Sequence, residues 1–440
     1  MKIDNDSLFR QCRKVLKDNQ RGSYTVPAEG LYPHQWLWDS CFIAIGLSHY
    51  DIERAKKELL SLTRGQWKNG MLPNMIFAGG WRYSAERYFW DSKRNLDAPK
   101  KIATSSITQP PMLAEAVVQI GKELSVASRQ AWYEQMLPSL IDYHQWLYTE
   151  RDPGKQGLTL QIHPWEVGLD NTPPWVTQLQ ENHNPWWLNA AKILPIDWLI
   201  NRFRRDIKQT DKSHRISNLD ALMYLDIIWR FRRRDYLIDE IIDHDKYLVQ
   251  DLSYNCILIR ANQHLETIAG SLKRSLPDNL QTSINNSRQA LEMLWDEPSG
   301  EYYSRGFGNQ MLIKSSTIAC LMPLYSGSIS HARAGQIVKK LQDEGAFNLN
   351  WPIPSVPYNS KWFDQDKYWQ GPTWLNTNWL IIQGLKHYGF NKEARLISDK
   401  SLQLVAKHGA GEYFSPLTGQ PLGARNFSWT AALAIDLLNS

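Results

Sequence analysis

The densest group of side chains that could bind a sugar lies at residues 366–379, DKYWQGPTWLNTNW, directly before an apolar run at 380–382. Aromatic side chains alternate there with amides and a carboxylate around one Gly-Pro break. Flat rings cover the apolar face of a pyranose, and amides and carboxylates bond its hydroxyls. A buried helix does not need such groups at its start, so the segment is interpreted as pocket wall. The candidate contacts are Tyr368, Trp369, Gln370 and Trp374.

A related mixture lies near the N-terminus, at residues 31–41, LYPHQWLWDSC. Asp39 or Ser40 could simply cap the helix that follows. A cap does not explain a Tyr and two Trp residues beside it, so we interpret this loop as a second part of the wall. The polar loop 104–111 offers Gln109 toward vicinal hydroxyls, although an ordinary capped turn explains that segment equally well. The candidates from the first loop are Tyr32, Trp36, Trp38 and Asp39.

Two further loops supply carboxylates. Residues 163–175, HPWEVGLDNTPPW, contain Glu166 and Asp170 among two Trp and three Pro residues, so long regular structure is not expected. Ordering such a segment costs backbone entropy, which favours a functional interpretation. Glu412 lies between a flexible Gly-Ala-Gly and an aromatic pair. It is either an ordinary surface acid or a carboxylate directed into a pocket.

Two carboxylates from distant loops, in a cavity walled by Trp, match the needs of glycoside hydrolysis. One carboxyl must be protonated to release the leaving-group oxygen, and burial beside indoles raises a carboxyl pKa. The other must stay ionised to activate water or to attack the anomeric carbon. The sequence contains no HExxH, P-loop, GxGxxG or GxSxG motif that would favour another chemistry.

The elements that must position these loops are mostly helices, because apolar residues recur at helical spacing along most of the chain. Short alternating patterns predict strands only at 158–162 and 300–303. Asn218 is a plausible N-cap, and Pro110 with Pro111 favours a helix start at that point. The predicted helices cover residues 54–64, 111–124, 129–148, 188–203, 218–231, 244–271, 284–295, 333–342, 374–387, 392–406 and 429–438.

This pattern predicts an all-α toroid of paired helices. No low-complexity linker, composition shift or sharp repeat divides the chain, so we expect one catalytic domain over residues 1–440 rather than a solenoid. In a closed ring of helix pairs, alternate loops meet at one end. We therefore expect the Trp-rich loops to converge there.

Composition argues against several other classes. The net charge is +5 over 440 residues without a polybasic block, which argues against nucleic-acid binding. We interpret Arg202, Arg204 and Arg205, and the arginines within 230–234, as solvated helix faces. No apolar run reaches membrane-spanning length and the first residues are polar, so a cytoplasmic protein without a membrane partner is expected.

The four cysteines are scattered and have no His partner at ligand spacing. They are expected to be reduced structural thiols, and no metal or cofactor is predicted. The expected partner is a small glycoside, and the sequence is compatible with a homo-oligomer. The cysteines are Cys12, Cys41, Cys256 and Cys320.

The motifs and their order resemble glycoside hydrolase family 63, particularly its short bacterial members that hydrolyse glucosylglycerate and mannosylglycerate. The stretch YWQGPTWLNTNW is close to the family pattern YW(R/Q)GP-W-N-NW. Residues 166–173, EVGLDNTP, resemble its (W/E)-x-G-x-D-N-(S/T)-P segment, and trehalases of the related clan carry a similar Gly-x-Asp. The resemblance extends from about Tyr32 to Trp429.

The resemblance implies an (α/α)6 barrel and an inverting mechanism. Asp170 occupies the family's general-acid position and Glu412 its general-base position, and Asp39 would hold hydroxyls of the sugar at subsite −1. An inverting pair is expected roughly 6.5–9.5 Å apart, with a water between. The positions that match the sugar and aglycone subsites are Tyr32, Trp36, Trp38, Asp39, Gln109, Trp165, Gly168, Asn171, Tyr368, Trp369, Gln370 and Trp374.

The aglycone is less well defined by the sequence. A glycerate carboxylate needs an Arg or several hydroxyl donors, and Arg215 and Tyr83 are the candidates. The chain departs from the family's Arg-Pro-Thr pattern around Arg215, with Ala221 and Leu222 where a Tyr is expected. Glycerate, glycerol and a second sugar therefore stay open as aglycones, and glucose and mannose as the sugar.

The pocket has three other interpretations. A sugar epimerase on an α/α toroid would be expected to use paired histidines, but His34, His163 and His183 are dispersed among loops. A catalytically silent carbohydrate-binding toroid would keep the aromatic wall and lose one acid, whereas both acids are present. An isoprenoid cyclase would need a DDxxD motif, which the sequence lacks.

Overall fold

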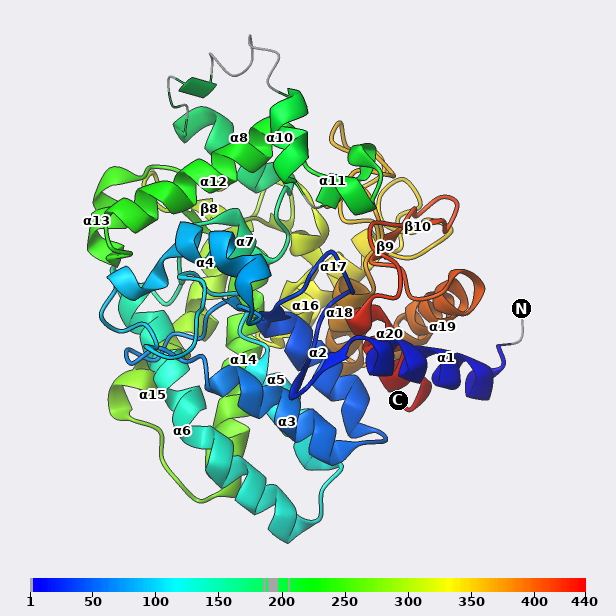
Figure 1. Ribbon diagram of the computed structural model, residues 1–440. Helices are drawn as coiled ribbons and strands as arrows, with labels where there is room; N and C mark the ends of the chain where they lie inside the picture. The colour runs from blue at the N-terminus through cyan, green and yellow to red at the C-terminus, as the bar shows by residue number, and fades with distance from the viewer. Residues whose placement is uncertain (1–2, 184, 186, 189–196, 205) are drawn as a thin grey trace.

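The computed structural model describes residues 3–183, 185, 187–188, 197–204 and 206–440, and its centre is a closed ring of helices (Figure 1). Each inner helix contacts the next in chain order, and the last, α20, packs along α2 and closes the ring. The inner helices are α2 (Leu37–Ser48), α5 (Leu113–Lys122), α14 (Leu252–Ser271), α16 (Pro323–Ser326), α18 (Leu375–His387) and α20 (Ser428–Leu438).

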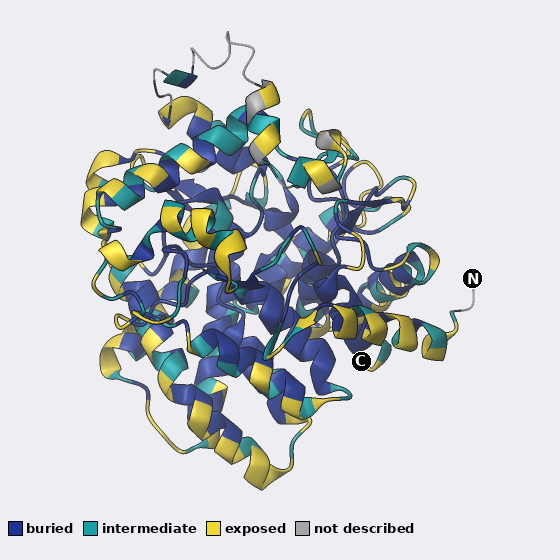
Figure 2. Ribbon diagram, viewed as in Figure 1, coloured by how far each residue is buried: buried dark blue, intermediate teal, exposed yellow. Residues whose placement is uncertain are grey.

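A second layer of helices packs outside this ring, as an (α/α)6 barrel requires, and the predicted fold is confirmed. Burial follows the two layers (Figure 2): every residue of α2 is buried, whereas α1 buries a stripe of Leu8, Cys12 and Leu16 four residues apart. The outer helices are α1 (Asn5–Asp18), α3 (Ile52–Thr63), α6 (Val126–Glu150), α15 (Asp278–Ala290), α17 (His331–Leu341) and α19 (Asn391–His408).

One end of the barrel is covered by a long excursion between α6 and α14 together with a shorter one after α3. In Figure 1 these helices lie above and in front of the ring. They are α4 (Ser84–Trp90), α7 (Pro164–Val167), α8 (Pro173–Asn182), α10 (Asp197–Phe203), α11 (Asp206–Gln209), α12 (Asn218–Arg233) and α13 (Ile238–His244), with 3-10 turns η1 (Trp81–Tyr83), η2 (Ser92–Arg94) and η3 (Lys212–His214).

The strands in the described residues are two residues long and form antiparallel pairs that fix loops. The β9–β10 hairpin carries the loop after Glu412, and β3 pairs with β4 beside the start of α2. The pairs are β1 (Gln20–Arg21) with β2 (Tyr24–Thr25), β3 (Gln35–Trp36) with β4 (Met75–Ile76), β5 (Val249–Gln250) with β8 (Arg305–Gly306), β6 (Trp295–Asp296) with β7 (Glu301–Tyr302), and β9 (Tyr413–Phe414) with β10 (Pro421–Leu422). The remaining 3-10 turns are η4 (Leu291–Leu294) and η5 (Ile318–Leu321).

Most predicted helices are confirmed within a few residues, two local predictions are wrong, and a third is only partly covered by the described residues. Residues 244–271 are not one helix, because α13 ends at His244, β5 follows, and Asp251 then caps α14 by accepting from the Tyr254 N–H. Residues 158–162 form only one isolated bridge, between Gln161 and Val249. The predicted helix 188–203 is described only from Asp197 onward, as α10; residues 189–196 lie outside the described residues.

The predicted helix starts also differ from the structure. Ser217, not Asn218, caps α12, since its hydroxyl accepts from the Asp220 N–H. Pro110 and Pro111 precede α5 instead of opening it, because the helix begins at Leu113. α1 and α8 were not predicted, although the stripe of α1 is visible in the sequence.

The interpretation of the arginines as solvated helix faces is only partly right. Arg202 is exposed, but Arg204 follows α10 and binds Asp206 through two nitrogens, with its side chain largely buried. Arg205 lies outside the described residues. In the second run, Arg230 pairs with Asp226 at 2.7 Å. Arg232 forms an ion pair with Asp91, and Arg234 forms one with Asp245.

The four cysteines are buried and free, as expected for structural thiols. No helix in the described part of the chain is long and apolar enough to cross a membrane.

The contact between α2 and α20 provides a test of the ring closure. A methyl group at Gly46 would collide with the backbone of Ala432, which cannot yield as a flexible side chain does. Gly46→Ala is expected to destabilise the protein by about 1–3 kcal/mol, measured by urea unfolding followed by circular dichroism.

Gly335→Ala is the matched control, because Gly335 lies inside α17 and its added methyl meets open space. That variant is expected to be neutral or more stable by up to about 1 kcal/mol, since Ala favours helix. Equal stability of the two variants would contradict the close packing of α2 on α20.

Candidate active site

A cavity of about 260 Å³ opens at the covered end of the barrel, where the predicted loops converge. This volume lies at the small end for ligand pockets and suits one sugar with a short aglycone. The predicted site residues that line the cavity are Tyr32, Trp36, Trp38, Asp39, Gln109, Trp165, Gly168, Asp170, Arg215, Tyr368, Trp369 and Glu412.

Several polar atoms of this wall are buried without a protein partner. The indole N–H groups of Trp36, Trp369 and Trp429 and the side-chain oxygen of Gln109 have no hydrogen bond from the described residues. Buried polar groups are normally paired, so an unpaired set around one cavity is suited to the hydroxyls of a ligand. The wall therefore combines apolar ring surface with unused donors and an acceptor.

Three of the predicted sugar contacts lie one layer behind the wall. Trp374 stacks on Trp369, with ring centroids 3.7 Å apart and planes 4° from parallel. The side-chain oxygen of Asn171 accepts a hydrogen bond from the backbone N–H of Trp369 at 3.0 Å. The backbone carbonyl of Asn171 accepts one from the side-chain amide of Gln370 at 2.8 Å. These three residues fix the ring of Trp369 rather than line the cavity.

Tyr83 does not line the cavity either. Its ring packs edge-on against His34, with centroids 5.0 Å apart. His34 in turn contacts Glu86 at 2.6 Å and accepts from the Ala78 N–H. The prediction that Tyr83 approaches the aglycone therefore does not match its position in this structure.

Asp170 is presented by a loop that is anchored on both sides. Gly168 ends α7 in the left-handed region, φ 72°, and a side chain there would collide with Trp38. The Asp170 carbonyl accepts from the Tyr224 hydroxyl at 2.8 Å. Desolvation raises the pKa of Asp170 to about 7 and the charge of Glu412 adds to the rise, whereas Arg215 and a hydrogen bond from Tyr368 oppose it.

The second acid of this loop has a structural role. Glu166 is fully buried, and it pairs with Arg151 at 2.7 Å while accepting from the backbone N–H groups of Ile162 and Thr108. Thr108 precedes Gln109 of the cavity wall. Glu166 therefore ties the loop of Asp170 to the loop of Gln109.

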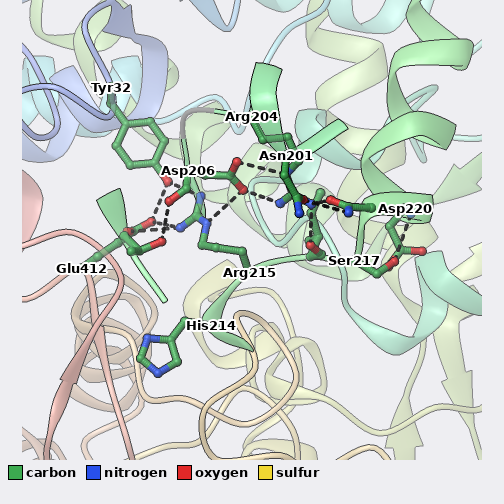
Figure 3. Close-up of polar contacts among 12 residues, drawn as sticks. Tyr32, Asn201, Arg204, Asp206, His214, Arg215, Ser217, Asp220 and Glu412 are labelled. Atoms are coloured by element: carbon green, nitrogen blue, oxygen red, sulfur yellow. Dashed lines mark hydrogen bonds and ion pairs between the residues drawn. The ribbon is translucent and has the colours of Figure 1, made fainter. Parts of the chain in front are cut away.

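Glu412 is almost completely buried and is held by three groups, of which Tyr32 and Arg215 are labelled in Figure 3. Its Oε1 accepts from the Tyr32 hydroxyl at 2.7 Å and from Arg215 Nη1 at 3.1 Å. Its Oε2 accepts from the Ala424 N–H at 2.8 Å. The left-handed Gly423, φ 65°, is required beside it, because a side chain there would collide with the carboxylate.

Arg215 connects this carboxylate to a chain of alternating charges that also appears in Figure 3. Its guanidinium donates to the Tyr32 oxygen at 2.7 Å, lies 4.5 Å from the Tyr368 ring centroid, and approaches Asp206 at 3.5 Å. Asp206 is held by Arg204, which also donates to the Ile216 carbonyl at 2.9 Å. Arg215 was predicted as a contact to substrate; here it holds Glu412.

Asp39 is a third carboxyl in the cavity. It lies in the first turn of α2 and is buried. Desolvation raises its pKa well above the usual range, its own backbone N–H opposes this, and the charges of Glu412, Asp170 and Glu58 add to the rise. A carboxyl of this kind, directed into a cavity, can exchange hydrogen bonds with sugar hydroxyls in either protonation state.

Sequence reasoning missed part of the wall. Arg204 was assigned to a solvated helix face, and Asp206 carries no motif. Phe427 and Trp429 follow the loop of Glu412 in the sequence, and their aromatic character was the signal that could have identified them. The missed residues are Pro27, Arg204, Asp206, Ile216, Ala221, Leu225, Phe427 and Trp429.

The histidines are engaged away from the cavity. His163 contacts the Tyr224 carbonyl at 3.1 Å and His183 contacts Asp226 at 3.1 Å. No histidine lines the cavity among the described residues, which disfavours an epimerase with paired histidines. The described residues also contain no group of three or more His, Cys, Asp or Glu arranged to hold a metal ion.

An (α/α)6 barrel with carboxyls in a Trp-walled cavity at its loop end is suited to the hydrolysis of glycosides. Comparison with known proteins agrees. The family model described as "Mannosylglycerate hydrolase MGH1-like glycoside hydrolase domain" matches residues 32–430. The chain belongs to this family.

Individual relatives match along nearly their whole length. A mannosylglycerate hydrolase of Thermus thermophilus is 37% identical over 96% of this chain and 98% of its own. A glucosylglycerate hydrolase of Mycolicibacterium hassiacum is 30% identical, with 96% of each chain covered. The crystal structure of the GH63 mannosylglycerate hydrolase from Thermus thermophilus with Tris and D-glycerate superposes with a TM-score of 0.87 at 36% identity, covering 98% of this chain and 99% of that chain.

The close contact between Gly423 and Glu412 yields a prediction for the site. Gly423→Ala is expected to lower kcat/KM by at least about tenfold, equivalent to about 1.4 kcal/mol of transition-state stabilisation, because the new methyl displaces the Glu412 carboxylate. Initial rates on the best glycoside substrate measure the effect.

Gly300→Ala is the matched control, since Gly300 has nearly the same backbone angle, φ 66°, but its added methyl meets open space. Both variants carry a similar backbone penalty of about 1–2 kcal/mol. An equal loss of activity in both would mean that general destabilisation, not the position of Glu412, causes the effect.

Proposed function

We propose that the protein is an inverting α-glycosidase that hydrolyses mannosylglycerate or glucosylglycerate, with Asp170 as general acid and Glu412 as general base. The single observation that carries the proposal is that these two carboxyls, 242 residues apart in sequence (412 − 170), line one small cavity. Their environments differ: desolvation raises the pKa of Asp170, whereas Tyr32, Arg215 and the Ala424 N–H donate hydrogen bonds to Glu412.

Asp170 has the properties of the acid. Its pKa, raised to about 7 by desolvation, keeps a large fraction of the carboxyl protonated at neutral pH. A protonated carboxyl can donate to the glycosidic oxygen as the bond to the anomeric carbon breaks. The anchored loop and the hydrogen bond from Tyr224 to its carbonyl keep the acid in place.

Glu412 has the properties of the base. Tyr32, Arg215 and the Ala424 N–H hold both of its oxygens in fixed directions. A carboxylate held in this way can accept a proton from a water that attacks the anomeric carbon from the opposite face. Direct attack would instead give retention, so the anomer that is released decides between the two.

The substrate class rests on the relatives and on the charged side chains that line the cavity. The relatives named above act on glycosides of glycerate according to their names, and the matched crystal structure contains D-glycerate. Arg204 and Arg215 line the cavity together with Asp206. A glycerate carboxylate would meet Arg215 while that guanidinium still holds Glu412, which couples aglycone binding to the base.

The pKa of Asp170 predicts the pH dependence. A raised pKa means that the active, protonated form is present below about 7 and is lost as the pH rises through that value. The rate kcat/KM is therefore expected to fall on the alkaline side with a midpoint near 7. A profile that stays flat from pH 6 to pH 9 would exclude Asp170 as the acid.

Substitution tests the two roles separately. Asp170→Asn and Glu412→Gln keep the size of each side chain and are each expected to lower kcat by several orders of magnitude, because each removes a proton-transfer group. Glu166→Gln is a useful comparison, since Glu166 is buried as Glu412 is but ties loops together. It should chiefly lower thermal stability; near-native rates in either catalytic variant would contradict that assignment.

The product identifies the reaction. Purified protein is incubated with mannosylglycerate, glucosylglycerate, glucosylglycerol and α-linked disaccharides, and proton NMR follows the sugar that is released. Inversion predicts the β-anomer before mutarotation, with glycosylglycerates hydrolysed fastest. Early release of the α-anomer would contradict the role of Glu412 as base, and hydrolysis of the neutral glycosides alone would contradict glycerate as the aglycone.

A further inference from the structure

An exposed apolar strip leaves the cavity along α12. Ala221, Leu225 and Trp229 are spaced four residues apart, so they follow one face of the helix with about 6 Å between successive positions. Ala221 and Leu225 line the cavity. Leu225 is 40% exposed and Trp229 is 46% exposed, so the apolar face continues from the cavity wall onto the surface.

A second aromatic ring lies beside Trp229. Tyr88 belongs to α4, which packs against α12 (Figure 1), and its side chain is 75% exposed. The guanidinium of Arg232 lies 5.0 Å from the Tyr88 centroid and 5.3 Å from the Trp229 centroid. Asp91 holds Arg232 at 3.2 Å. Arg232 therefore orients both rings while leaving much of their surface in solvent.

The burial of the residues that line the cavity shows which end of the cavity the strip reaches. Trp38, Asp39 and Trp369 are buried and form the closed end, whereas Leu225 is exposed and marks the mouth. In an enzyme that removes one sugar, the sugar occupies the closed end and the aglycone points to the mouth. The strip therefore begins where the aglycone ends.

We propose that Leu225, Trp229 and Tyr88 form an additional carbohydrate-binding subsite, which takes a second sugar ring attached to the aglycone side of the substrate. The inference rests on the proposed function for the position of the cleaved bond. Continuity with the cavity favours a ligand that already occupies the cavity over a separate partner. Exposed rings beside a charged pair match the apolar faces and hydroxyls of a pyranose, and a three-carbon glycerate does not reach this far.

The test uses binding, because binding does not depend on turnover. In the full chain carrying Asp170→Asn, calorimetry measures the Kd of α-1,2-mannobiose, α-1,2-mannotriose and the corresponding glucose oligosaccharides. In the mannose series, the glucose series or both, the trisaccharide is expected to bind about tenfold tighter than the disaccharide. This ratio of Kd values equals about 1.4 kcal/mol of binding free energy. Adding Trp229→Ala should abolish this difference and leave disaccharide affinity unchanged.

Tyr358→Ala is the matched control, because Tyr358 is 49% exposed and does not line the cavity; it should preserve the difference. Equal affinity for the two chain lengths, or no binding of either, would overturn the subsite. So would a Trp229→Ala variant that keeps the difference but changes the particle mass in light scattering, since the strip would then join copies of the chain. Failure to hydrolyse glycosylglycerates would refute the proposed function alone, because these affinities need no turnover.

Discussion

The buried contact of Arg215 with Glu412 is the interaction on which the rest of the site depends. It joins the hairpin after α19 to the excursion between α6 and α14, two segments that are far apart in sequence. Tyr32, from a third segment, completes the contact by donating to Glu412 and accepting from Arg215. A buried carboxylate is costly unless charge and hydrogen bonds compensate it, and here they come from separate loops. The loops must therefore assemble together, and each one fixes the others.

The barrel makes this assembly possible because its packed helices provide most of the stability, whereas its loops carry most of the side chains of the site. Inner helices such as α2 and α20 are buried on nearly all sides and close-packed, so the loop ends start from fixed positions. The loops can then carry buried acids, left-handed residues and unpaired indole N–H groups, all of which would weaken a core. Asp170 illustrates the separation: desolvation raises its pKa, and the charged groups that modify the rise, Arg215 and Glu412, also lie outside the inner helices.

Residue type and local pattern were sufficient to predict the helical toroid and most of the cavity wall. Trp36, Trp38 and Asp170 stand in segments whose composition has no simple structural explanation, and the structure brings them together. Residues that act through another residue could not be predicted. Trp374 and Gln370 belong to the same segment and the same residue types as residues that do line the cavity. Only the fold shows that they lie behind Trp369. Arg204 resembles a surface arginine in the sequence, and only the structure shows that its side chain pairs with Asp206.

The closure of the ring by α20 on α2 has a consequence for biosynthesis. α2 emerges from the ribosome well before α20, one of its two main neighbours, which follows about 380 residues later in the chain. Contacts between such distant segments slow folding, and apolar surface that waits for its partner promotes aggregation. Throughout translation the unclosed barrel exposes a helix that is buried on every side in the finished protein. We therefore expect the yield of folded protein to depend on protecting α2 until α20 has been made.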